Sequence, residues 1–128
     1  MTLFGQARLA QVHPDLIRLV TAVSAVTDVQ VVQGARTVAA EEIAIWERTS
    51  ALKDPRASKH VLTSERTLAC ALDVAPWPVH WANIPAFVSL ATLVLATASA
   101  LSIEIEWGGN WRHLKDYDHI EMRDSWHT

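Results

Sequence analysis

Apolar residues recur at helical spacing near the N-terminus of the chain. Leu16, Leu19, Val20 and Val23 lie three or four positions apart, which is the pattern of one buried helix face. The stretch His13-Pro14-Asp15 comes directly before them. Proline suits the first turn of a helix, and an acidic residue there complements the positive end of the helix dipole. The pattern therefore predicts a helix that begins near Pro14.

Four other segments have the pattern of β-strands. Val29 to Val32 is short and rich in β-branched residues. Thr67 to Val74 and Ile103 to Trp107 alternate along the chain, as expected where successive side chains point to opposite faces of a sheet. A last short strand is predicted from His119 to Met122. In the second of these segments, alternation places Asp73 on the face opposite Leu72.

Two further helices and one long loop complete the predicted elements. Thr37 can cap a helix from about Ala39 to Arg48, and an apolar helix is expected from about Pro85 to Leu101. The polar stretch from Lys53 to Glu65 shows no period and is predicted to be a loop; loops of this length are often functional. The order of elements predicts a single α+β domain over residues 1–128. We expect a small, largely antiparallel sheet with helices packed against it.

The apolar helix raises the question of a membrane span. The chain carries no formal charge from Val79 to Ile103, a length that would suffice to cross a bilayer. However, Pro85 lies near its start, several serines and threonines interrupt it, and no basic cluster flanks it. A helix that is apolar on all sides is also typical of a buried core helix, so we expect no stable membrane span.

Composition excludes several other classes of protein. The 128-residue chain is 50% hydrophobic, and its net charge of −3, with scattered basic residues, gives no basic face for nucleic acid. Cys70 is the only cysteine, which excludes an internal disulfide. The first residues lack a basic region followed by an apolar run, so no signal peptide is predicted. We expect a monomer.

The C-terminal quarter contains the clearest candidates for chemistry. Trp107-Gly-Gly-Asn-Trp111 precedes Asp116 and His119, which are three residues apart at the entry to a predicted strand. Histidine is the commonest metal ligand among side chains, and a nearby carboxylate can act as a general base. By themselves, these two residues also fit an ordinary polar turn.

The wider pattern resembles a known family. Trp-Gly-Gly-Asn-Trp followed by Asp-x-x-His resembles the C-terminal signature of the D-Ala-D-Ala carboxypeptidase and L-alanyl-D-glutamate peptidase superfamily, which includes phage endolysins. Asn110 replaces the usual aspartate, and Asp118 stands where proline is common. Upstream, Val12–Val20, Gln33–Thr37 and Ala71–Pro76 resemble the family's opening helix, Gly-x-Arg-Thr turn and Ala-x-Asp strand, in the same order. The resemblance implies a hedgehog/D-Ala-D-Ala peptidase-like fold.

The resemblance also implies roles for individual residues. Asp73 and His119 would bind Zn²⁺, and Asp116 would be the acid/base that acts on the water at the zinc. Arg36 would bind substrate and polarise the scissile carbonyl. Catalytic zinc sites of this kind take three protein ligands and keep one position open. Trp107 and Trp111 flank the Gly-Gly turn, so both are candidates for contact with glycan or peptide, with packing as the alternative.

The third ligand can be aligned in two ways. The family pattern places a histidine seven residues before the aspartate, and in this chain that position is Arg66. Arginine stays protonated and cannot bind zinc. Alternatively, Ser58-Lys59-His60 supplies a Ser-x-His motif with a longer loop before Asp73, and loop insertions cost little free energy. We favour His60. Cys70 could also bind metal, but alternation places it opposite Asp73.

Two hypotheses about function follow. In the first, the chain is a zinc peptidase that cleaves peptidoglycan stem peptides, as an L-alanyl-D-glutamate endopeptidase of phage endolysin type or a related carboxypeptidase. It would be made in the cytoplasm and reach the cell wall or periplasm after release, or be carried in a virion. In the second, it is a catalytically silent relative that binds cell-wall peptide or has a structural role in a virion.

Overall fold

The computed structural model describes residues 2–37, 58–64, 66–112 and 115–123. Its elements are the strands β1 (Leu3–Phe4), β2 (Val29–Gln33), β3 (Ala71–Pro76), β4 (Ile105–Trp107) and β5 (His119–Met122), the helices α1 (Pro14–Ser24) and α3 (Ile84–Ala100), and the short 3₁₀ helices η1 (Gln6–Leu9) and η3 (Gly108–Asn110). This content confirms the predicted α+β class.

The strands form one five-stranded sheet in the order β1-β2-β3-β5-β4. The pairing of β1 with β2 is parallel, whereas β2–β3, β3–β5 and β4–β5 are antiparallel. The sheet is therefore largely antiparallel, as predicted. Its central strand β3 pairs directly with β5, although β4 lies between them in the sequence. This crossover brings Asp73 and His119, 46 positions apart, into direct cross-strand register.

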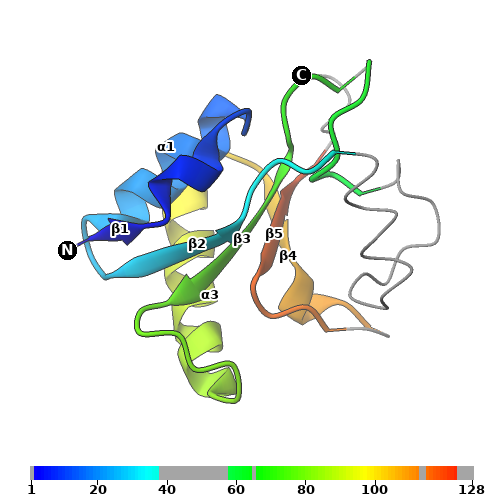
Figure 1. The fold of residues 1–128 in the computed structure, drawn as a ribbon. Helices are drawn as coiled ribbons and strands as arrows, with labels where there is room; N and C mark the ends of the chain where they lie inside the picture. Colours follow the sequence, from blue (N-terminus) through cyan, green and yellow to red (C-terminus); the bar gives the residue numbers. More distant parts are fainter. Residues whose placement is uncertain (1, 38–57, 65, 113–114, 124–128) are drawn as a thin grey trace.

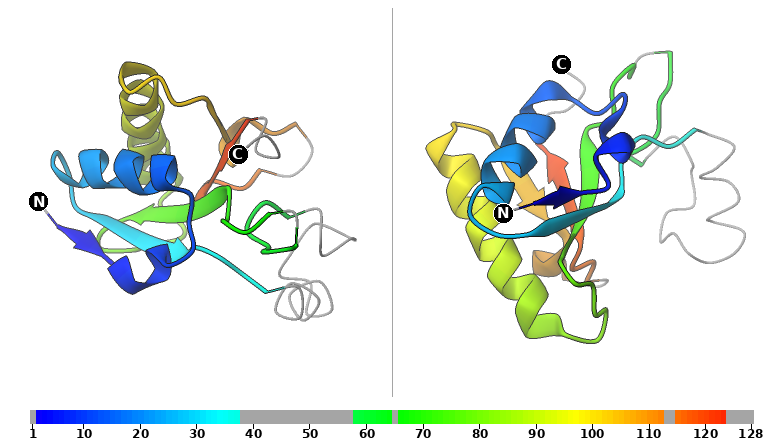
Figure 2. Two further views of the ribbon diagram at one scale, coloured as in Figure 1. Left: turned by 90° about the horizontal axis from the view of Figure 1, so that it is seen from above. Right: turned by 60° about the vertical axis from the view of Figure 1, so that its left-hand side comes forward.

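Helices α1 and α3 both pack on the same face of the sheet, as the turned views show clearly (Figures 1 and 2). Between the helices and the sheet lies the hydrophobic core. Its buried members come from every layer and include Leu16, Leu19, Val29, Leu72 and Val94. Neither of the two described α-helices packs on the opposite face of the sheet (Figure 2).

The two-residue alternation of β3 and β5 divides their side chains between these two faces. Leu72 and Val74 of β3, like Ile120 and Met122 of β5, belong to the core cluster on the helix side. Asp73 lies between Leu72 and Val74, so its side chain projects to the face opposite the helices. The same alternation places His119 and Glu121 on that face, and polar residues from two paired strands meet there.

The helix boundaries follow the signals in the sequence. His13 is the N-cap residue of α1, and its Nδ1 accepts a hydrogen bond from the backbone N–H of Asp15 at 3.0 Å. Asn83 caps α3 in the same way, accepting from the N–H of Ala86 at 3.3 Å. Within the described residues, no helix combines the length and the apolarity that a bilayer crossing requires.

Several sequence predictions differ from the structure. The strand expected from Thr67 begins only at Ala71, because Ala69 instead pairs with Val12 in an isolated bridge and Leu68 is exposed. The strand expected from Ile103 begins at Ile105. The short β1 and η1 were not predicted at all, since two apolar residues carry no periodic signal. The predicted helix over 39–48 lies outside the described residues, as does part of the predicted 53–65 loop.

The core position Leu16 provides a test of this packing. Its side chain is fully buried in α1, so Leu16→Ala removes apolar contacts and leaves a cavity. We expect the free energy of unfolding to fall by about 2–5 kcal/mol, measured by urea denaturation. Val26→Ala is the control, because Val26 is 60% exposed. Equal losses for the two variants would contradict the assignment of the core.

Candidate metal centre and acid/base site

The site begins with a cross-strand pair. In the antiparallel pairing of β3 and β5, Asp73 lies directly opposite His119. Side chains at such positions on one face project side by side. His119 Nδ1 consequently lies 3.1 Å from Asp73 Oδ1. The backbone register of two central strands thus fixes two of the candidate ligands before any loop contributes.

His60 approaches this pair from a loop that is held in place by backbone hydrogen bonds. The carbonyl of His60 accepts from the N–H of Arg36 at 2.8 Å, and the N–H of Leu62 donates to the carbonyl of Arg36 at 3.0 Å. The preceding carbonyl, that of Lys59, accepts from the N–H of Cys70 at 2.8 Å. These bonds join the loop to the segment after β2 and to the start of β3, so the direction of the His60 side chain is set by its neighbours.

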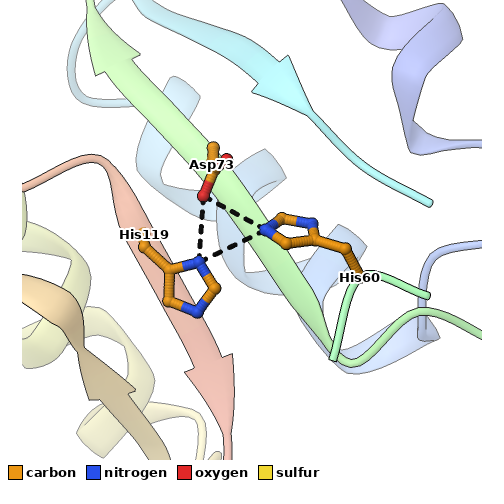
Figure 3. Close-up of side chains that lie close together, drawn as sticks. All are labelled: His60, Asp73 and His119. Atoms are coloured by element: carbon orange, nitrogen blue, oxygen red, sulfur yellow. Dashed lines mark hydrogen bonds and ion pairs between the residues drawn. The ribbon is translucent and has the colours of Figure 1, made fainter. Parts of the chain in front are cut away.

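The three side chains converge on one point, as Figure 3 shows. His60 Nε2 lies 3.2 Å from His119 Nδ1 and 3.3 Å from Asp73 Oδ1. Both histidines are buried, at 4% and 7% exposure. The structure therefore brings together His60, Asp73 and His119, the three residues for which the sequence suggested a ligand role, and they form a possible metal-binding group.

The outer ring nitrogens of both histidines have acceptors. His60 Nδ1 lies 2.8 Å from the carbonyl oxygen of Gly34, and His119 Nε2 lies 3.0 Å from Glu121 Oε1. A carbonyl or carboxylate oxygen only accepts, so each of these nitrogens carries the proton. The other nitrogen of each ring, which faces the site, is then the one able to bind a metal.

The charges of the cluster are mutually stabilising. Burial alone would raise the pKa of Asp73, but hydrogen bonds from His119 and His60 lower it well below its ordinary value. Burial likewise opposes the charged form of His119, yet the hydrogen bonds to Asp73 and Glu121 raise its pKa to about 10. These hydrogen bonds therefore favour the protonated form of His119 in the metal-free chain. A bound cation would take the place of its Nδ1 proton.

The donor set fits a tetrahedral zinc ion. Ligand atoms bound to one zinc at about 2.0–2.1 Å in a tetrahedron lie about 3.3–3.4 Å from each other. The three donor atoms here are 3.1, 3.2 and 3.3 Å apart. Two imidazole nitrogens and one carboxylate oxygen are also ligands that zinc accepts. Geometry and chemistry thus both agree with the ion that the sequence suggested.

Arg66, the residue at the family's usual ligand position, lies in a different arrangement. Its Nη1 donates to the carbonyl of Ser58 at 2.6 Å and lies 3.5 Å from that of Val61. Arg66 therefore holds the turn that carries His60. Cys70 is fully buried in the core cluster, where its thiol donates to the carbonyl of Leu68. This is the face predicted for it, opposite Asp73.

Asp116 lies at the rim of the cluster. Its Oδ2 is 4.0 Å from His119 Nδ1, and its side chain is 43% exposed. Asp118 lies beside it and is also partly buried. Burial, followed by a side-chain hydrogen bond with Asp116 and repulsion from Asp73, raises the pKa of Asp118 to about 9. A protonated Asp118 can donate to Asp116, which leaves Asp116 as the accessible carboxylate of the pair.

The remaining candidates lie around this centre. The ring of Trp111 is half-buried, with its centroid 5.1 Å from that of His119. Trp107 packs against the core cluster, and its Nε1 donates to the carbonyl of Tyr117 at 2.8 Å. Arg36 is partly buried and pairs through its backbone with the segment around Val61. The substrate-binding roles of these three residues remain predictions.

Comparisons with known proteins agree with this arrangement. The sequence profile of the phage L-alanyl-D-glutamate peptidase family matches residues 2–127. The chain belongs to this family. It is 31% identical over 124 residues to the L-alanyl-D-glutamate peptidase of Escherichia phage T5, covering 93% of this chain and 85% of that protein. The predicted membership of a family of cell-wall peptidases is confirmed.

A solved structure supports the fold as well. The L-Ala D-Glu endopeptidase ChiX of Serratia marcescens superimposes with a TM-score of 0.74 at 26% identity, over 95% of this chain and 90% of that one. The predicted peptidase-like α+β fold is therefore confirmed.

The glycines of the family signature have a steric explanation. A Cβ on Gly108 would collide with the carbonyl oxygen of Asp116, and one on Gly109 would collide with the ring of Trp107. The carbonyl of Gly108 accepts from the N–H of Asp116 at 3.0 Å. The Trp-Gly-Gly stretch thus packs directly on the backbone that presents Asp116. Gly34 is comparable, since a Cβ there would meet the carbonyl of Arg8.

Glu121 and Asp118 contribute to the site but were not predicted from the sequence. Glu121 follows His119 by two residues on a strand, a spacing that places both side chains on one face. That spacing was an available signal. Asp118 gave none, because on the alternation of β5 alone it would fall on the opposite face from His119, and its position depends on the turn before the strand.

The contact between Gly108 and Asp116 can be tested. In Gly108→Ala, the added methyl group meets backbone that a side-chain rotation cannot move away. We expect the free energy of unfolding to decrease by about 1–3 kcal/mol, measured by chemical denaturation. Ser99→Ala, at an exposed position of α3, is the control and should behave as wild type. A Gly108→Ala variant of unchanged stability would contradict the close approach.

Proposed function

We propose that this chain hydrolyses peptidoglycan stem peptides at the bond between L-alanine and D-glutamate, with one zinc ion held by His60, Asp73 and His119. Family membership supports the class of reaction and the bond. The zinc site is supported by a single observation: three donor atoms lie 3.1–3.3 Å apart, with both imidazoles oriented by second hydrogen bonds.

A zinc ion at this site would supply Lewis acidity, making water a nucleophile near neutral pH and polarising the scissile carbonyl. The chain's own residues supply the rest. Asp116 is exposed to solvent beside the ligand His119. In that position its carboxylate can take the proton from the attacking water and return it to the leaving amine. The neighbouring carboxyl of Asp118 orients Asp116 through their hydrogen bond.

Arg36 and the two tryptophans are proposed to hold the substrate. Arg36 is joined through its backbone to the loop of His60, so its cationic side chain starts from a segment next to a candidate ligand. A cation at the site can bind a carboxylate of the stem peptide or stabilise the developing oxyanion. Trp111 lies beside His119 and offers an apolar wall. Trp107, whose Nε1 is bonded to the carbonyl of Tyr117, would contribute the edge of its ring.

The silent alternative is favoured by the alignment of Arg66 with the ligand position, and also by Asn110 and Ala69, which replace residues usual in the family. Arg66 instead bonds to the turn at Ser58, and a histidine occupies the third corner of the cluster. This arrangement supports an active enzyme.

A substrate in the bacterial wall further implies that the protein works outside the cytoplasm in which it is made, after release or from a virion. We propose that it acts there as a single-domain monomer.

The ligand assignment leads to a prediction for His60→Ala. With one of three ligands removed, we expect the purified variant to lose bound zinc after reconstitution and to lose wall-degrading activity, as chelator treatment of the wild type should also do. Zinc content and lysis of isolated peptidoglycan are measured in parallel. His80→Ala changes a histidine outside the cluster and should retain both properties. Stoichiometric zinc in His60→Ala would contradict the assignment.

Asp116 should affect turnover and leave the metal in place. In Asp116→Asn the general base is lost, so kcat should fall by a factor of about 10²–10⁴ while zinc content stays unchanged. The control is Asp15→Asn, because Asp15 is equally exposed, at 43%, but lies at the start of α1. Cleavage of a synthetic stem peptide measures the rate. Wild-type kcat in Asp116→Asn would remove this residue from the mechanism.

A further inference from the structure

A largely buried ion pair lies directly behind the candidate ligands. Glu121 Oε1 is 3.0 Å from His119 Nε2, and Glu121 Oε2 is 2.7 Å from Lys59 Nζ. One carboxylate therefore bonds a ligand histidine with one oxygen and a lysine with the other. Ala71 lies opposite Glu121 in the β3–β5 register, and its small side chain leaves space for this arrangement.

Lys59 connects the same carboxylate to the other ligand histidine, because it directly precedes His60 in the chain. Its Nζ also donates to the carbonyl of Met122 at 2.7 Å, and its own carbonyl accepts from the N–H of Cys70 at 2.8 Å. Lys59 thus ties the loop of His60 to the end of β5 and the start of β3. These elements carry or adjoin all three candidate ligands.

A comparison within the sheet shows that the pair is unusual. Glu106 is the register partner of Glu121 on β4 and forms an ion pair of its own with Arg123. That pair is 3.5 Å long with side chains 45% and 58% exposed, whereas Glu121 and Lys59 are only 15% and 16% exposed. Burying two charges costs solvation energy that their attraction offsets only partly. Stability alone is therefore a weak reason for the buried pair.

We infer that Lys59 and Glu121 are positioning residues for the metal centre: Glu121 fixes the ring of His119, and Lys59 links that carboxylate to the loop of His60. The inference rests on the zinc site proposed above. A carboxylate acceptor holds the imidazole in the orientation that turns Nδ1 to the ion and makes that nitrogen a stronger ligand. The lysine fixes the carboxylate and, through the chain, the distance between the two histidines.

Zinc affinity tests the inference without any measurement of activity. Glu121→Ala should weaken zinc binding by about 10- to 100-fold, measured by competition with a chromogenic chelator, because such supporting contacts have effects of this size. Lys59→Met should weaken it in the same direction by a smaller factor. Glu121→Gln keeps an oxygen acceptor for His119 and should recover part of the affinity. Glu106→Ala is the matched control and should bind zinc as wild type does.

A second measurement applies to the metal-free protein. NMR spectroscopy of nitrogen-labelled histidine should show a hydrogen-bonded, slowly exchanging Nε2 proton on His119 in the wild type and in Glu106→Ala. In Glu121→Ala that proton should exchange rapidly. This signal does not require zinc, so it tests the orientation of His119 even if the wild type proved unable to bind the metal. If the wild type bound no zinc, the proposed function would be wrong, and the NMR signal would still decide whether Glu121 orients the ring of His119.

Other outcomes would overturn the inference. Zinc affinity in Glu121→Ala and Lys59→Met equal to that of the wild type, with only a lower melting temperature, would show that the pair is a structural link and nothing more. An unchanged Nε2 proton in Glu121→Ala would lead to the same conclusion. If Glu121→Ala fails to fold, Glu121→Gln and Lys59→Met carry the test, because both keep side chains of similar size. Equal affinity in those two variants and the wild type then rejects the inference.

Discussion

The site depends on the antiparallel register of β3 and β5. Asp73 lies opposite His119 because the two strands pair as they do, and their carboxylate and imidazole meet at 3.1 Å on the face away from the helices. A shift of either strand by one residue would turn its polar side chain into the hydrophobic core. Leu72 and Ile120 also pair with each other and belong to that core, so their burial stabilises the register of β3 and β5. The same residues that stabilise the fold hold the candidate ligands in place.

The third candidate ligand reaches this pair by a different route. His60 comes from a loop, and backbone hydrogen bonds to Arg36 and Cys70 align that loop with the strands. Arg66, at the usual ligand position, now bonds to the turn before His60. The backbone contacts of the loop bring His60 to this pair although its spacing from Asp73 differs from the family pattern. A metal site requires that donor atoms meet in space, and chain length between them adds little free energy once the loop is held.

Charge balance is the second constraint on this face. Asp73, two histidines, Glu121 and Lys59 are all largely removed from water, and each has a partner of opposite or complementary character. Buried polar groups of this kind seldom improve stability over an apolar core. Their alignment around one point fits the zinc site proposed above. Asp116, by contrast, is left accessible at the rim, where a proton carrier has to exchange protons with substrate and solvent.

Local sequence patterns account for much of the fold and part of the site. Helical spacing from Leu16 to Val23, the β-branched run at Val29 and the alternation around Asp73 and His119 each formed the predicted element. The Asp-x-x-His spacing and the Trp-Gly-Gly stretch likewise pointed to the correct family. The choice between His60 and Arg66 could not be made from spacing, and Glu121 was missed. Both depend on which residues meet across strands and loops far apart in the chain. Contacts of this kind are decided by tertiary structure, because strand pairing and burial bring the residues together and no local sequence pattern encodes them.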